Sequence, residues 1–159
     1  MSARFDPDTV NVVGLEKLLK ALKAKPPVAR VGVLAAENAR SGSAGNATIG
    51  AVHEYGAPGR GIPQRSFLRV PISEHLQEQM ESGELVGEAE TKEVLKQGSV
   101  VPWLNKVAGI ALQVVKTAFQ TGGYGKWAPW KDPNYENNTG MLLVDSHQLR
   151  DSITKDVKE

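Results

Sequence analysis

His53 and Glu54 are the residues of this chain that most resemble a piece of catalytic machinery. A zinc protease carries such a His-Glu pair with a second histidine four residues after the first, so that both imidazoles lie on one helical face. Position 57 is alanine, and His75 and His147 stand at no spacing from His53 that is typical of zinc ligands. The sequence therefore predicts no metal site here, and we interpret His53 as a surface or helix-capping histidine.

Other sequence patterns that support catalysis are missing as well. The glycine-rich stretch 56–63 lacks the Gly-Lys-Ser/Thr ending of a phosphate-binding loop, and no serine stands in a nucleophile elbow. The chain has no cysteine, which excludes disulfides, thiolate zinc sites, iron–sulfur clusters and cysteine nucleophiles. We therefore predict that the protein is not an enzyme and uses no cofactor.

Three arginines within ten residues, Arg60, Arg65 and Arg69, form the strongest candidate binding group. Guanidinium groups bind phosphates or carboxylates through paired hydrogen bonds. The pattern leaves three interpretations open: a nucleic-acid contact, a contact with carboxylates of a partner subunit, and a solvated loop. The chain of 159 residues has a net charge of +1, so its surface as a whole does not favour nucleic acid.

The elements that position these arginines follow from hydrophobic periodicity. A helix is predicted over residues 8–24 from the spacing of Leu15, Leu18, Leu19 and Leu22. Alternation over residues 28–35 predicts a strand. Further helices are predicted over residues 48–55 with Thr48 as N-cap, 71–80, 88–97, 100–120 and 146–152 with Asp145 and Gln148 as a capping box, and a last strand over 153–157.

The broadest apolar face belongs to residues 100–120, which are expected to form a central helix. Hydrophobic residues make up 40% of the chain and charged residues 23%, which is enough for a packed core. We expect one α+β domain over residues 1–159, in which a small antiparallel sheet of the two strands packs against the central helix. No apolar run reaches the roughly 18 residues of a membrane span, so no membrane partner is expected.

Three stretches between these elements are expected to be extended loops or arms: 36–47, 57–65 and 121–140. Prolines and glycines exclude regular structure from the second, and Phe67 and Leu68 would anchor its far end. Trp127 and Trp130 lie in the third stretch, where they either pin the loop to the domain or anchor a subunit interface. Because the arms' own contacts look too few to offset the ordering entropy, we expect neighbouring chains to order them.

Two segments resemble signatures of tailed-phage neck and tail-completion proteins, including the virion-morphogenesis and HK97 gene-product-10-like groups. Residues 49–69, IGAVHEYGAPGRGIPQRSFLR, resemble the first signature, His-Glu-Phe/Tyr-Gly followed by Ile-Pro-x-Arg-x-Phe-hydrophobic-Arg. Residues 142–154, LLVDSHQLRDSIT, resemble the second, which usually follows an aromatic and proline stretch such as WAPWKDPN here. The matching positions are His53, Glu54, Tyr55, Gly56, Ile62, Pro63, Arg65, Phe67, Leu68, Arg69, Leu142, Leu143, Asp145, Gln148, Leu149, Arg150, Ser152 and Ile153.

The match has two departures. His147 stands where the second signature commonly has glycine. The order of the two signatures is the reverse of that in several relatives, which bears on the topology and the subgroup. Together the two segments cover roughly a fifth of the chain.

The resemblance implies a structural virion protein at the head–tail junction, assembled in the host cytoplasm. Its partners would be further copies of itself in a ring of about six, the tail tube or its terminator, and the head-side connector. Genomic DNA would pass through the lumen, which Arg60 would line. The residues expected to dock on neighbouring chains are Tyr55, Arg60, Ile62, Arg65, Phe67, Leu68, Arg69, Trp127 and Trp130.

The alternative hypothesis is a small nucleic-acid-binding or metal-dependent accessory protein. It would bind phosphates through Arg60, Arg65 and Arg69, with His53 and Glu54 acting on a metal. The two hypotheses differ in what they require of residues 53–69: a shaped docking arm in the first, and exposed cationic and metal-binding side chains in the second.

Overall fold

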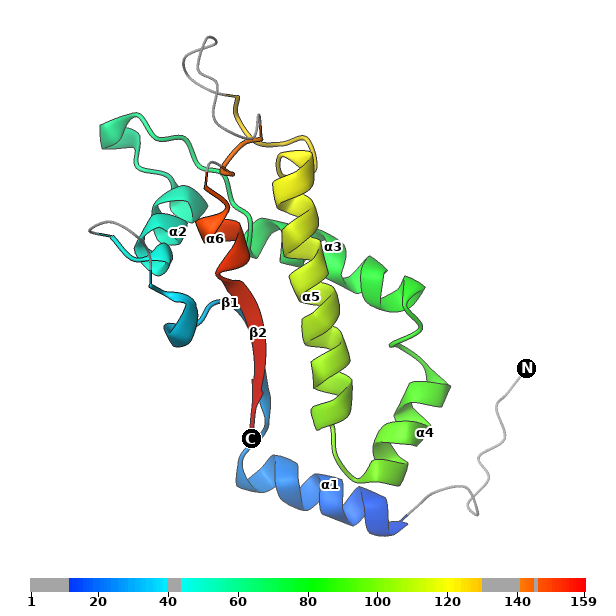
Figure 1. The fold of residues 1–159 in the computed structure, drawn as a ribbon. Helices are drawn as coiled ribbons and strands as arrows, with labels where there is room; N and C mark the ends of the chain where they lie inside the picture. The colour runs from blue at the N-terminus through cyan, green and yellow to red at the C-terminus, as the bar shows by residue number, and fades with distance from the viewer. Residues whose placement is uncertain (1–11, 40–43, 130–140, 145) are drawn as a thin grey trace.

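The segment with the broadest apolar face forms the longest helix among the described residues. The sheet and two other helices pack against it. A computed structural model describes residues 12–39, 44–129, 141–144 and 146–159 of the chain. The helix α5 (Val101–Thr121) buries a face that includes Val114, Val115 and Phe119. Figure 1 shows α5 running along a two-stranded sheet, with α1 lying across one end of the molecule. The predicted α+β fold with a long helix on a small antiparallel sheet is confirmed.

The sheet joins two segments from opposite parts of the chain. Strand β1 (Val28–Val33) pairs antiparallel with β2 (Ile153–Lys158), from Val28 opposite Lys158 to Val33 opposite Ile153. Val31 and Val33 pack against the core, as their alternation predicts. Arg30 stands opposite Asp156 in this register, and their side chains form an ion pair across the strands. The strand predicted to reach residue 35 stops at Val33, because a 3₁₀ turn, Ala35–Glu37, follows it.

Helix α2 (Asn46–Tyr55) begins two residues before the predicted N-cap Thr48, so that detail of the prediction is wrong. The cap comes from an earlier loop residue, because the side-chain oxygen of Asn38 accepts a hydrogen bond from the Ala47 amide at 2.8 Å. The Asn46 amide group donates to the carbonyls of Glu37 and Ala39, each at 3.0 Å. These bonds fix the described ends of the stretch 36–47 on the start of α2; residues 40–43 lie outside the described residues.

The other helices flank α5. Helix α3 (Arg69–Ser82) and α4 (Glu88–Gln97) both contact it, and α1 (Val12–Ala24) packs against α4. The leucine face predicted for the first helix is only partly covered, because Leu19 stays 46% exposed and Leu22 38% exposed. The predicted residues 8–11 of that helix lie outside the described residues.

The last helix, α6 (Gln148–Asp151), is shorter than the predicted 146–152. Its N-cap residue His147 has a φ of 61° and a ψ of −13°, in the left-handed region that glycine adopts without steric strain. The backbone therefore takes a conformation that suits glycine, although a histidine occupies the position. Asp145, the other half of the predicted capping box, lies outside the described residues.

We expect His147→Gly to raise the free energy of unfolding by about 0.5–1 kcal/mol, because it relieves a left-handed side chain at a cost in unfolded-state entropy. Urea denaturation measures the change. Ser146→Gly, one residue earlier and not at positive φ, is the matched control and should be neutral or destabilising. Equal destabilisation by both substitutions would contradict the explanation.

The core brings together residues from the whole chain. Its fully packed members are Phe67, Val115, Phe119, Val144, Leu149 and Ile153. The rings of Phe67 and Phe119 stand 5.1 Å apart, and Trp127 meets Phe119 edge-on at 5.7 Å. The core thus lies where α5 meets the loop before α3 and the segment that leads into β2.

Candidate functional site

A closed arm extends from the end of α2. The backbone groups of Ala57 and Ile62 exchange two hydrogen bonds, of 2.9 and 3.1 Å, around a 3₁₀ turn, Pro58–Arg60. We call residues 57–62 the arm, and Figure 1 shows it projecting beyond α2, away from α5. The arm therefore has backbone contacts of its own, and the expectation that neighbouring chains order it stays a prediction.

Gly56 allows the chain to turn from α2 into the arm. Its φ is 74°, and a Cβ placed there would lie 2.9 Å from the Gln64 amide nitrogen and 3.2 Å from the Ile62 carbonyl oxygen. Any side chain would collide with the returning strand of the arm, so the position requires glycine for both conformation and space. The predicted helix terminator at Gly56 is confirmed.

Glu54 ties the base of the arm to the start of α3. Its carboxylate is 6% exposed and accepts four hydrogen bonds. One oxygen accepts from the Ser66 hydroxyl at 2.5 Å and the Arg69 amide at 3.1 Å, and the other from the Phe67 and Leu68 amides at 3.0 Å each. These amides lie at the N-terminal end of α3, where the helix dipole also favours negative charge. The carboxylate is therefore fully engaged in holding two helices together.

Arg65 links the far side of the arm to the segment that follows α5. Its side chain donates from Nε to the Ala128 carbonyl at 2.9 Å and from Nη2 to the Pro129 carbonyl at 2.8 Å. The residue is 4% exposed, and burial lowers the pKa of the guanidinium from its ordinary value. An arginine stays protonated at neutral pH even so. The backbone amide of Arg65 donates to the His53 carbonyl at 2.8 Å, which closes the base of the arm.

Trp127 completes the same framework from the segment after α5. Its indole nitrogen donates to the Ser66 carbonyl at 2.9 Å, and its ring packs on Phe119. Of the two interpretations open for this tryptophan, the structure favours the one in which it pins its loop to the domain. Turns at 122–127 bring it there, with the Trp127 amide bonded to the Gly122 carbonyl at 2.9 Å. Trp130 lies outside the described residues.

The residues expected to dock on neighbours therefore fall into three groups. Arg65 and Phe67 are buried and Trp127 is half-buried, and these three hold the arm in place. Ile62 and Leu68 are half-buried. Tyr55, which is 66% exposed, and the exposed Arg60 and Arg69 remain accessible to another molecule.

A cavity of about 310 Å³ lies beside the accessible group. Tyr55, Leu68 and Arg69 line it together with β1 residues Gly32 and Val33. The small α2 residues Ala47, Gly50 and Ala51 form much of the remaining wall, which Glu54 and Phe67 complete. The arm base, this cavity and the end of β1 thus form one continuous surface.

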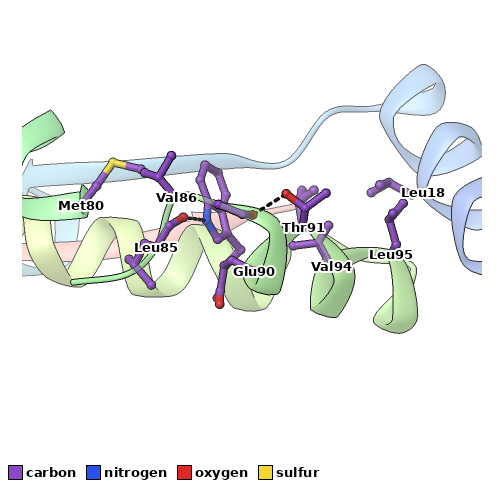
Figure 2. A pocket seen from close by; sticks show the side chains of 11 residues that line it. Leu18, Met80, Leu85, Val86, Glu90, Thr91, Val94 and Leu95 are labelled. Carbon is purple, nitrogen blue, oxygen red and sulfur yellow. Dashed lines mark hydrogen bonds between the residues drawn. The ribbon is translucent and has the colours of Figure 1, made fainter. Parts of the chain in front are cut away.

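A second cavity, of about 380 Å³, lies at the opposite end of the fold (Figure 2). Its walls are mostly aliphatic, running from Met80 on α3 to Leu18 on α1. Its polar side chains already have partners: Trp103 donates to the Leu85 carbonyl at 2.9 Å, Thr91 donates to the Gly87 carbonyl at 2.8 Å, and Glu90 pairs with Lys106 outside the cavity. A small polar ligand would find few groups free to orient it.

Sequence reasoning missed Glu54 as the organising residue of the site. The visible signal was Ser66, a hydroxyl shortly before a helix, whose oxygen accepts from the Val70 amide at 3.0 Å. The Glu54 carboxylate, which also accepts hydrogen bonds at this helix start, lies twelve residues before Ser66 and fifteen residues before Arg69. Local pattern rules cover only nearby residues, so they could not connect the two.

The described part of the chain shows neither a metal-binding cluster nor a membrane-spanning helix. Within residues 12–39, 44–129, 141–144 and 146–159, no three His, Cys, Asp or Glu side chains gather in a way that could hold a metal ion. No helix among these residues is long and apolar enough to cross a membrane.

Comparison with known proteins adds no relative: no family model, no curated protein and no solved structure matches this chain.

Proposed function

We propose that the protein is a structural virion component of a tailed bacteriophage, a ring-forming neck or tail-completion subunit at the head–tail junction. The ring would contain about six copies, related by head-to-tail contacts that close. The proposal begins from the resemblance of residues 49–69 and 142–154 to the two phage signatures.

One observation carries the proposal beyond the resemblance: both segments build a single framework. A Cβ on Gly50 would lie 3.3 Å from Phe67 of the first segment and 3.4 Å from Leu149 of the second, so the two side chains meet over one glycine. Phe67, Leu149 and Ile153 share one core cluster. The two segments are more than 70 residues apart in the chain, and we expect such distant segments to meet if both signatures serve to maintain one structure. Glu54 and Arg65, from the first segment, stabilise the same framework.

The framework presents the arm to partners. Tyr55 at its base offers a large amphipathic ring, a side chain type enriched in interfaces, and Arg60 at its tip is exposed. The tail tube or its terminator and the head-side connector are the partners we assign to this surface, besides neighbouring copies. Arg60 is the residue we assign to the DNA-facing lumen, because it is an exposed cation on the arm.

The alternative, a nucleic-acid-binding or metal-dependent accessory protein, loses support from the same contacts. It requires Glu54 to bind a metal and Arg65 to bind phosphate. Both side chains are buried and committed to backbone groups of their own chain. Only Arg60 and Arg69 of its three arginines remain exposed.

The test is assembly. Purified protein should form rings, or bind the ends of tails from the phage or prophage that encodes it, when mixed with them and viewed by electron microscopy. Tyr55→Ala with Arg60→Ala should abolish tail binding while circular dichroism stays unchanged. A protein that neither assembles nor binds tails, but cleaves or binds DNA with strong salt dependence, would overturn the proposal.

The arms supply a second readout. Hydrogen exchange of residues 57–65 and of 121–129 should slow when the subunit enters the particle, beyond the protection that their own bonds give in the free chain. Equal protection in both states would count against a role for these stretches in assembly.

A further inference from the structure

Helix α1 carries a surface that its own chain leaves uncovered. Leu19 and Leu22 are exposed on it, and the exposed lysines Lys20 and Lys23 stand beside them. Neither lysine forms an ion pair with any residue that the structure describes. We call these four residues the lysine patch. Exposed leucines in a row, rimmed by cations, are typical of a surface that another molecule covers.

The end of α3 and the turn after it carry the opposite charge. Glu78, Glu81 and Glu84 are exposed and, within the described residues, form no ion pair. Val86, 57% exposed, follows them and lines the aliphatic cavity of Figure 2. We call these four residues the glutamate patch. It complements the lysine patch, because it combines one apolar side chain with three negative charges, whereas the lysine patch combines two leucines with two positive charges.

We propose that the lysine patch of one copy docks on the glutamate patch of the next copy in the ring. The inference rests on the proposed ring-forming function and names the surface that would form the ring. A contact in which one copy gives only its lysine patch and the next gives only its glutamate patch is heterologous, and such contacts generate rings when the rotation closes. A symmetric contact of one patch with itself would set lysine against lysine, which is repulsive.

A second copy fits these patches better than a different partner, because the chain supplies both members of the pair. The chain's net charge of +1 does not show this separation, because opposite charges cancel in the sum. The leucines would gain apolar cover from Val86 and the neighbouring aliphatic wall, whose polar side chains Glu90, Thr91 and Trp103 are already paired or hydrogen-bonded. The arm lies at the other end of the fold and remains available for tail and connector proteins.

Charge reversal in two complementary variants tests the contact. Lys20→Glu with Lys23→Glu makes both patches acidic, and Glu78→Lys with Glu81→Lys makes both basic. We expect each variant alone to weaken self-association at least about tenfold, since two attractive pairs become repulsive. An equimolar mixture should assemble again, because an even-numbered ring can alternate the two variants. Sedimentation over a concentration series at low salt, with circular dichroism as the folding check, measures this.

A matched control carries the same change of charge outside the patches: Lys116→Glu with Lys158→Glu should associate like the wild type. Variants that associate like the wild type, or a mixture that stays dissociated, would overturn the inference and leave the proposed function standing. Association like the wild type is also the result expected if the chain's own N-terminal residues, and not a second copy, cover the lysine patch. A wild-type protein that forms no ring either alone or on tails would instead count against the proposed function.

Discussion

Glu54→Ala is expected to lower the free energy of unfolding by at least about 3 kcal/mol, one of the two largest effects of single substitutions that we predict. Alanine would leave the Ser66 hydroxyl and the amides of residues 67–69 without their buried acceptor. It would also remove a negative charge from the N-terminal end of α3. Urea denaturation, with the midpoint and slope both fitted, measures the loss.

Glu54→Gln separates the charge from the shape of this side chain. The glutamine amide nitrogen is a donor and would face the hydroxyl and amide donors that the carboxylate accepts from. We therefore expect the free energy of unfolding to fall by about 2 kcal/mol with the fold retained. Glu16→Ala, an exposed glutamate on α1, is the control and should stay within about 0.5 kcal/mol of the wild type. If Glu54→Gln unfolds at the wild-type midpoint, the carboxylate does not organise the arm in the way that its contacts indicate.

Arg65→Lys should be the second large effect, a loss of about 2–3 kcal/mol despite the conserved charge. The guanidinium reaches two successive carbonyls, of Ala128 and Pro129, through two of its nitrogens. A lysine ammonium is a single point donor that cannot reproduce this fork, and burial disfavours its charge. We expect the amides of residues 125–127, which bond within their own turns, to exchange faster in the variant.

Arg60→Lys is the matched control, because it makes the same substitution in the same arm at an exposed position. It should change neither the stability nor the exchange of residues 125–127. Wild-type stability and wild-type exchange in Arg65→Lys would show that the segment after α5 is held by Trp127 and the core alone. Arg65 would then have no positioning role.

Both effects concern the fold, yet they bear on the proposed assembly. The arm keeps its direction because Glu54 fixes one side of its base and Arg65 the other. A rigid arm loses less entropy on docking than a flexible one, so binding of a tail or connector should be tighter. Variants at these positions should therefore lose assembly activity together with stability, whereas changes at Tyr55 or Arg60 should affect docking alone.

Periodicity in the sequence determined the elements and the fold class. The apolar face of residues 100–120 was broad enough to predict α5, and the alternation in residues 28–35 and 153–157 predicted the two strands, the first of them two residues too long. Gly56 predicted the end of α2 because only glycine tolerates the exit conformation. These are local properties, since a helical face, a pleat and a turn are each set by residues a few positions apart.

Tertiary structure alone decided what residues 53–69 do. The sequence presented Arg65 as a binding group and Glu54 as half of a metal motif, but packing buried both and gave them backbone partners distant in the chain. It also left Leu19 and Leu22 exposed, although their spacing predicted a buried face. The physical reason is the same in each case: periodicity shows that a residue has a partner face, whereas the identity of that partner depends on contacts between segments that no local pattern encodes.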